Sequence, residues 1–162
     1  MKRRMSALLC LFVLGFVVTG VAAADTVISI GIKDPGFERS DPASSFWRGT
    51  AHKDALNGSY YHDNQYDRPD LYATWTPTIT VSGKYNVYMR WIAHPNRSSA
   101  ALVHVVHKNG RAEFQVNQRE NGAQWNLLGQ FEFAVGTSGY VRLYSSPGYT
   151  IFDGVRFQLV EE

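Results

Sequence analysis

Aromatic side chains next to amides or arginines are the residues of this sequence that point most clearly to ligand chemistry. Trp125 stands between Gln124 and Asn126, after a glycine-containing turn. An indole face can cover the apolar C–H face of a sugar ring, while amides hydrogen-bond its hydroxyl groups. The alternative is that Trp125 anchors the core. We favour this alternative, because the apolar pair Leu127-Leu128 follows almost at once.

Three other polar segments supply further candidates. Tyr60, Tyr61 and Asn64 form an aromatic and amide-rich stretch, which is either a binding surface or a tyrosine corner that holds a loop. Arg97 either clamps a carboxylate or hydroxyl pair, or is an ordinary solvated loop residue. Tyr149 follows a Pro-Gly turn. The candidate ligand-binding residues are therefore Trp47, Tyr60, Tyr61, Asn64, Arg97, Gln124, Trp125 and Tyr149.

The other tryptophans differ in their expected exposure. Trp91 alternates with polar residues in a strand-like run, and Trp75 shares a face with alanine and leucine, so both are expected to be structural core residues. Trp47 follows Ser44-Ser45-Phe46 at the edge of a loop and is expected to be the most exposed of the four.

Asp153 is the single acid on an otherwise apolar strand face, between Ile151 and Val155. A buried carboxylate must be hydrogen-bonded or paired, because burial penalises its charged form. We expect a structural acid that binds backbone amides or an arginine across the fold. A catalytic or calcium-binding acid is the alternative, but no second acid is close in the sequence.

Nucleophilic and metal chemistry receive little support. There is no Gly-Xaa-Ser-Xaa-Gly elbow, and His104 and His107 would lie on opposite faces of one strand. No cofactor or metal ligand set is predicted. A structural calcium ion at Asp34, Glu38 and Asp41 is an alternative, although their spacing fits no calcium-binding loop.

The N-terminus has the features of a secretory signal peptide. Lys2, Arg3 and Arg4 precede an apolar run, and three alanines end the segment at residue 24. Cleavage there would leave residues 25–162 as a single secreted domain, extracellular or periplasmic, that meets a membrane only through the transient signal. The 16 basic residues would fall to 13 against 14 acidic ones, a net charge of −1. This balance argues against a nucleic-acid partner.

The elements that must position these side chains are strands. Apolar and polar residues alternate over 85–92, 111–118, 130–135, 140–144 and 151–159, and further strands are expected at 27–31, 47–52, 60–63, 71–76 and 101–107. Asn109-Gly110 predicts a hairpin in which both residues have positive φ. About nine or ten strands joined by short turns predict an all-β antiparallel sandwich, with residues 42–66 forming loops at one end.

Several segments, in order, resemble the golvesin C-terminal-like domain, which is also found beside xanthan-lyase catalytic domains. The segment Val116–Gly129 is the most distinctive. The others are Asp34–Phe37, Tyr60–His62, Ala73–Pro77, Gly83–Tyr88, Gly136–Gly139 and Asp153–Phe157. Gly154 stands where the family usually has alanine. The resemblance implies a jelly-roll β-sandwich similar to galactose-binding and carbohydrate-binding modules.

The leading hypothesis is therefore non-catalytic binding of a polysaccharide through exposed aromatic and amide side chains. A second is an extracellular assembly or adhesion module that binds a protein partner or itself through a polar sheet face at Arg111, Glu113, Gln115 and Asn117. A third is a polysaccharide hydrolase or lyase that uses carboxylates, although no pair of acids stands out.

Overall fold

The computed structural model describes residues 26–65 and 67–161, and every regular element within them is a β-strand. The expected signal peptide, residues 1–24, lies outside the described residues. Within the described part of the chain, no helix is long and apolar enough to cross a membrane. The strands are β1 (Val27–Gly31), β2 (Phe37–Arg39), β3 (Arg48–Ala51), β4 (Ser59–His62), β5 (Tyr72–Trp75), β6 (Gly83–Arg90), β7 (Ala101–His107), β8 (Gly110–Val116), β9 (Asn126–Phe133), β10 (Tyr140–Tyr144), β11 (Ile151–Phe152) and β12 (Gly154–Leu159).

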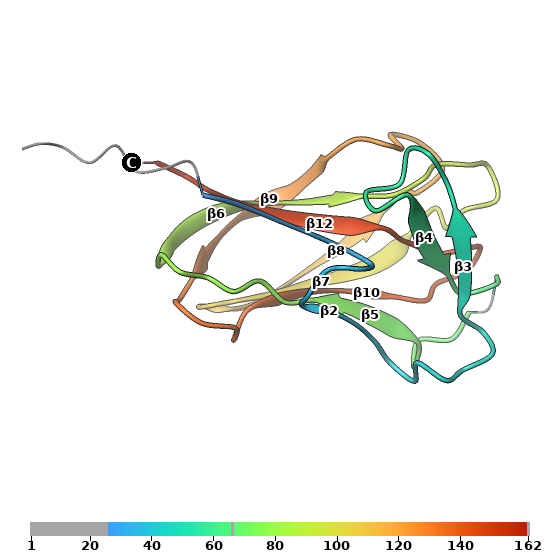
Figure 1. The fold of residues 1–162 in the computed structure, drawn as a ribbon, viewed down its shortest axis with the longest axis horizontal. Coiled ribbons are helices and arrows are strands. Elements are labelled where there is room, and N and C mark those ends of the chain that lie inside the picture. The colour runs from blue at the N-terminus through green and yellow to red at the C-terminus, as the bar shows by residue number, and fades with distance from the viewer. Residues whose placement is uncertain (1–25, 66, 162) are drawn as a thin grey trace, which may run out of the picture.

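Two antiparallel sheets are stacked on each other (Figure 1). One has four strands in the order β1-β12-β6-β9, and the other has five in the order β2-β5-β10-β7-β8. A third sheet, β11-β4-β3, stands at one end of the stack (Figure 1). The expected all-β antiparallel sandwich is confirmed.

The core lies between the two large sheets, and the alternation in the sequence predicts it well. On β6, Tyr85, Val87 and Met89 are buried, while the residues between them are at least partly accessible. Val103 and Val105 of β7 face them from the opposite sheet, also fully buried. Each such side chain contributes about 1.5–3 kcal/mol through the burial of apolar surface.

The β7–β8 hairpin is confirmed, but its turn differs from the predicted one. His107 pairs with Gly110, so the two turn residues are Lys108 and Asn109. Only Gly110 has a positive φ, of 130°, and Asn109 does not. Hairpins of this kind place the positive φ on a glycine that follows the turn, rather than on both central residues.

Two further expectations need correction. The structure has twelve strands in its described part instead of nine or ten, because it adds the short edge strand β2 and divides the predicted strand 151–159 into β11 and β12. The strands expected at 47–52 and 60–63 are confirmed as β3 and β4, so residues 42–66 contain a hairpin as well as loops. The predicted strand 151–159 is divided at Asp153: β11 pairs with β4, and β12 pairs with β1 and β6. The chain therefore passes from the small end sheet to the four-stranded sheet at this residue.

The ends of the described chain are neighbours. β1 and β12 run antiparallel, with Val27 opposite Gln158. The start of β1 and the end of β12 therefore lie together at one end of the sandwich, and β3 and β4 lie at the other (Figure 1). We call the β3–β4 side of the molecule the hairpin end.

Candidate functional site

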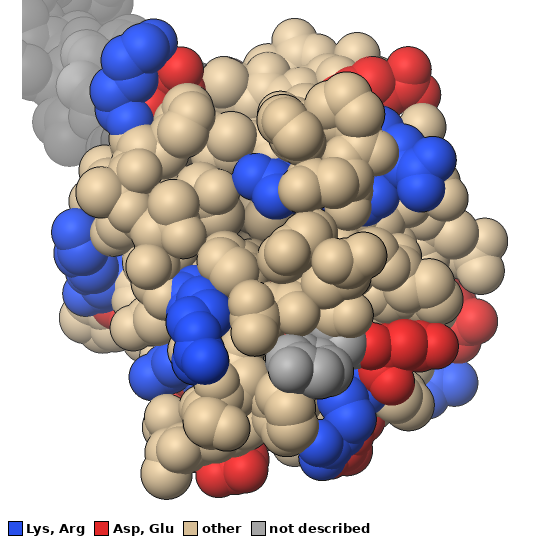
Figure 2. All heavy atoms as spheres, turned by 90° about the vertical axis from the view of Figure 1, so that its right-hand side faces the viewer, with Lys and Arg blue, Asp and Glu red and all other residues tan. Residues whose placement is uncertain are grey.

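The hairpin end brings together side chains that are far apart in the sequence. Figure 2 views this end and shows lysine, arginine and acidic side chains interspersed around a largely uncharged middle. Strand β4 divides the aromatic residues here, because successive side chains of a strand point to opposite faces. Tyr60 and His62 lie on one side, and Tyr61 lies on the other with Phe37 and Trp47.

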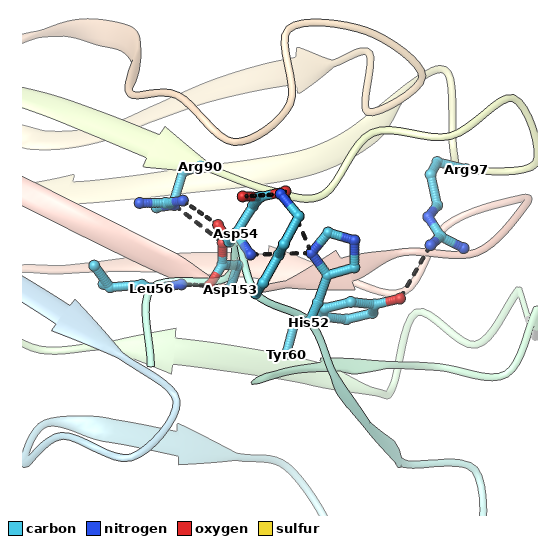
Figure 3. A network of polar contacts seen from close by, with 8 residues as sticks. His52, Asp54, Leu56, Tyr60, Arg90, Arg97 and Asp153 are labelled. Atoms are coloured by element: carbon cyan, nitrogen blue, oxygen red, sulfur yellow. Dashed lines mark hydrogen bonds and ion pairs between the residues drawn. The ribbon is translucent and has the colours of Figure 1, made fainter. Parts of the chain in front are cut away.

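The first group contains three predicted site residues, Tyr60, Arg97 and Tyr149. The Arg97 guanidinium carbon lies 5.8 Å from the ring centroids of both tyrosines. Its Nη2 donates to Tyr60 Oη at 3.1 Å, as Figure 3 shows, and its Nε and Nη1 donate to Ile92 O and Asn96 Oδ1. All three side-chain nitrogens of Arg97 therefore donate hydrogen bonds to other groups of the protein.

His62 completes this first group. Its ring meets that of Tyr149 edge-on, with centroids 5.4 Å apart. Burial lowers the pKa of His62, and the nearby positive charges of Arg97 and Arg48 lower it further. Tyr60 was expected to contact ligand, but its side chain is only 4% exposed. This prediction is wrong, because the ring is held under Arg97 as part of the packing.

Trp47 was expected to be the most exposed tryptophan, and this prediction is also wrong. Its side chain is 6% exposed. The ring packs edge-on against Phe152 with centroids 4.9 Å apart, and Nε1 donates to Ser40 O at 2.9 Å. Pairing of β4 with β11 brings Phe152 beside the hairpin, so a distant part of the chain covers the indole.

The second group lines an open cleft that contains Tyr61. The cleft has a volume of about 500 Å³ and is lined by Ile32, Phe37, Glu38, Arg39, Pro42 and Tyr61. Phe37 and Tyr61 are parallel, with centroids 6.1 Å apart. The Arg39 guanidinium lies 4.1 Å from the Tyr61 centroid and, within the described residues, forms no hydrogen bond or ion pair. We call this the Tyr61 cleft.

Of the residues in the Tyr61 cleft, the sequence predicts only Tyr61. Phe37, Glu38 and Arg39 form the short edge strand β2, which pairs with β5. An arginine three residues after a Pro-Gly turn, such as Arg39, does not by itself indicate a binding site. The family motif that ends at Phe37 is the one sequence feature that could have drawn attention to this strand.

Of the remaining loop candidates, Asn64 adjoins the first group through His62, and Gln124 lies apart from both groups. Asn64 has a positive φ of 56°, and its backbone N–H donates to His62 Nδ1 at 3.0 Å, so it forms part of a turn. Gln124 is exposed, and its Nε2 donates to Asn121 Oδ1 at 3.4 Å. Neither residue lines the Tyr61 cleft.

Trp125 lies on the outer face of the four-stranded sheet. The Arg156 guanidinium is 4.3 Å from its ring centroid, and that of Arg90 is 5.4 Å away. Trp125 is half-buried and does not belong to the hydrophobic core cluster of the described residues, so the favoured interpretation as a core anchor is wrong. The guanidinium groups of Arg156 and Arg90 pack against the Trp125 ring in place of core residues.

Asp153 is buried where the chain changes sheets. One carboxylate oxygen accepts from Leu56 N at 2.8 Å, and the other accepts from Arg90 Nε at 3.1 Å (Figure 3). Arg90 also donates to the backbone oxygen of Asp54. Burial raises the pKa of Asp153, and the Leu56 amide and Arg90 oppose that shift. These partners, an amide and an arginine, are of the kind expected for a structural acid.

Trp75 and Trp91 lie in the core. Trp75 is fully buried, and its Nε1 is the buried side-chain donor that finds no acceptor within the described residues. Trp91 is 3% exposed, and its Nε1 donates to Glu120 O at 2.8 Å.

Two buried polar residues were not singled out from the sequence. Asp63 accepts from Ser145 Oγ at 2.6 Å and from Thr150 N at 3.0 Å, and burial raises its pKa. The amide of Gln118 bonds both backbone groups of Ile151, at 2.8 and 2.9 Å. Both residues hold loops of the hairpin end on the sandwich.

The three acids considered for calcium do not gather into a site. Asp34 accepts from Gly31 N at 2.8 Å and from Asn57 Nδ2 at 3.4 Å. Among the described residues, no three histidine, cysteine, aspartate or glutamate side chains form a group that could hold a metal ion.

Known proteins resemble this chain in both sequence and structure. Xanthan lyase of Bacillus sp. (strain GL1) is 36% identical over 112 residues, which are 66% of this chain and 12% of the lyase. The Paenibacillus xanthan lyase structure superposes with a TM-score of 0.79 and 34% identity over 85% of this chain and 13% of that chain. This chain thus spans about an eighth of the length of either lyase.

A second structural neighbour shares the fold at much lower identity. The family 35 carbohydrate-binding module from Clostridium thermocellum superposes with a TM-score of 0.57 and 10% identity, over 82% of this chain and 99% of the module. Residues 38–159 match the Golvesin C-terminal domain. That match covers most of the chain and agrees with the motifs that resembled this family, and the chain therefore belongs to the Golvesin C-terminal domain family.

Proposed function

We propose that this protein is a non-catalytic carbohydrate-binding module that acts outside the cytoplasm and binds a polysaccharide in the Tyr61 cleft. The observation that carries the proposal is the composition of this cleft, in which aromatic and apolar surfaces lie beside the Arg39 guanidinium, which has no hydrogen-bond or ion-pair partner among the described residues. Sugar rings present apolar C–H faces and hydroxyl edges, and ligand sites commonly combine apolar walls with a few polar groups.

Each part of the Tyr61 cleft has a role in this proposal. Phe37 and Tyr61 form the apolar wall, against which one sugar face packs. The Arg39 fork donates to ring hydroxyls, and the Glu38 carboxylate accepts from them. Because Tyr61 already holds the Arg39 guanidinium in place, little side-chain entropy is lost when the sugar binds.

The comparisons support the class of ligand. The relative that is 36% identical is named for xanthan, a polysaccharide, and the second structural neighbour is a carbohydrate-binding module. Secretion is proposed from the expected signal peptide at residues 1–24, since a polysaccharide ligand would be met outside the cell.

Pull-down of the purified protein on insoluble polysaccharides and peptidoglycan, with a soluble glycan array, tests the proposal. We expect saturable binding to one class of glycan, competed by its soluble fragments. Arg39→Gln should weaken that binding about tenfold, which corresponds to about 1.4 kcal/mol. Arg119→Gln is the matched control, because Arg119 is exposed and does not line the cleft. Absence of binding to every glycan would refute the proposal.

A self-association module is a second candidate, and the position of β8 favours it. β8 is an edge strand of the five-stranded sheet, so its exposed edge can pair with another strand. Arg111 and Glu113 project from the strand and restrict the partners it can accept. A molar mass that rises with concentration in light scattering would support this function, and a constant monomer mass would exclude self-association.

A further inference from the structure

The outer face of the five-stranded sheet carries polar and aromatic residues on neighbouring strands. The pairing register places five side chains in one row across the sheet: Glu38, Thr74, Arg142, His104 and Glu113. Tyr140 and Tyr144 lie on this face beside Arg142, because they are two residues away from it on β10. Phe37 and Arg39 point to the opposite side of β2, toward Tyr61. This face therefore adjoins the Tyr61 cleft at β2, where Glu38 and Arg39 line the clefts on both sides, but its central residue Arg142 does not line the Tyr61 cleft.

Arg142 is held firmly at the centre of the row. Its guanidinium carbon lies 4.1 Å from the ring centroid of Tyr72 and 4.9 Å from that of Tyr140. Its Nε donates to Thr74 Oγ1 at 3.1 Å. Within the described residues, the two terminal nitrogens have no acceptor and no carboxylate partner. A planar cation fixed by two rings, with its terminal nitrogens free, is pre-organised to receive a carboxylate through two hydrogen bonds.

An open cleft of about 280 Å³ lies over this arginine. It is lined by Glu38, Arg39, Ser40, Tyr72, Thr74, Thr76, Tyr140 and Arg142. The volume is at the small end of ligand sites and suits one sugar ring of a longer chain. The hydroxyl groups of Tyr72 and Tyr140 form no hydrogen bond within the described residues, so both are free to bond a ligand. Glu38 lies two strands away from Arg142 and can accept from a hydroxyl on the far side of the ring.

We propose that this outer face holds a second binding site, which takes a carboxylated sugar such as a uronate residue within a glycan. Arg142 binds the carboxylate, the two tyrosines contact the ring, and Glu38 accepts from a hydroxyl. The inference rests on the proposed function in taking a glycan as the ligand. It shares Glu38 with the Tyr61 cleft, but it depends on Arg142, Tyr72 and Tyr140 and adds a requirement for negative charge.

Isothermal titration of the purified protein with hexagalacturonate, with hexamannuronate and with the methyl ester of hexagalacturonate tests this site. The ester keeps the sugar chain and removes its charge. We expect at least one acid to bind and the ester of hexagalacturonate to bind at least tenfold more weakly than its acid. Arg142→Gln should remove that difference, and Arg142→Lys should restore only part of it, because lysine keeps the charge without the fork.

Arg111→Gln is the matched control, since Arg111 lies on the same face and its removal also deletes one positive charge. Equal binding of acid and ester, or equal effects of the Arg142→Gln and Arg111→Gln changes, would overturn this second site and leave the proposed function standing. If neither acid binds, this inference also fails. The pull-down on neutral polysaccharides then decides the proposed function separately. Circular dichroism verifies that each variant is folded.

Discussion

Single residues in this protein show how far burial changes the role that a residue type suggests. Tyr60 and Trp47 have the side chains of a sugar-binding surface, yet both are packed inside the hairpin end. Arg97 and Arg39 are both arginines near tyrosine rings, yet Arg97 donates hydrogen bonds to protein groups, whereas Arg39 has no such partner in the part of the chain that the structure describes. The availability of polar groups, rather than residue type, therefore distinguishes structural residues from candidate binding residues.

The buried Asp63 gives a prediction for pH dependence at the residue scale. Burial raises its pKa above the ordinary value of 3.8, so the folded state binds its proton more tightly than the unfolded state does. The stability contributed by this proton is fully present below pH 3.8 and is lost as the pH rises through the folded pKa. Urea denaturation from pH 3 to pH 7 should therefore show wild type losing stability relative to Asp63→Asn.

Asp70 is the matched control for this prediction, because the hydrogen bond from Arg68 lowers its pKa. The wild type should gain stability relative to Asp70→Asn as the pH rises, which is the opposite direction. Parallel pH profiles for the two variants would contradict the assignment of Asp63 as a buried acid with a raised pKa.

At the scale of elements, the sequence predicted the long strands of the two large sheets and the approximate positions of β3 and β4, but not β2, the separate strand β11 or the pairing of the small end sheet. β6 and β7 are long and bury every second residue, which is the pattern that a sequence displays directly. β3 has four residues with little burial, and β11 has two residues that are both buried. Their pairing depends on contacts between distant segments, so the environments of Trp47 and Tyr60 could not be predicted from local pattern.

Gln118 gives a prediction about how such elements are held. Its fully buried amide bonds both the N–H and the carbonyl of Ile151 and so attaches the loop after β8 to β11. Gln118→Leu leaves both backbone groups of Ile151 without this partner, at a cost of about 1–3 kcal/mol for each buried group. We expect a loss of about 2–6 kcal/mol in the free energy of unfolding, measured by urea denaturation.

The neighbouring Asn117 offers the comparison for this substitution. Its side chain bonds Glu120 and the Arg119 amide at the surface, so Asn117→Leu removes an amide from the same loop without burying an unsatisfied group. We expect it to cost less than about 1 kcal/mol. Equal losses for the two variants would show that Gln118 does not hold β11.

For the whole molecule, the sequence predicted the fold class and the family, and the site only in part. The fold class can be predicted because the alternation of apolar and polar residues and the turn residues are local signals. The family can be predicted because its motifs are spread over the chain. The Tyr61 cleft depends on where the short edge strand β2 lies beside the hairpin end. Tyr61 was predicted from its residue type, whereas Phe37, Glu38 and Arg39 needed the assembled sandwich.

β1 closes one edge of the four-stranded sheet, and we expect the stability of the whole sandwich to depend on it. β1 covers one edge of β12, and Ile30 lies in the core. Removal of residues 26–31 should expose the β12 edge and lower the melting temperature, with aggregation in light scattering. Val27→Ala is the control and should change the melting temperature little, because Val27 is 44% exposed. An unchanged melting temperature after the deletion would show that the sandwich closes without β1.

The pairing of the two chain ends also has a mechanical consequence. Because Val27 lies opposite Gln158 at the end where both strands leave the sheet, tension on the two termini acts across their ladder of hydrogen bonds. The ladder would open one pair at a time, as a zipper does, instead of resisting in shear along its whole length. We therefore expect stretching in an optical trap to peel β1 away at low force, before the hairpin end and its cleft are disturbed.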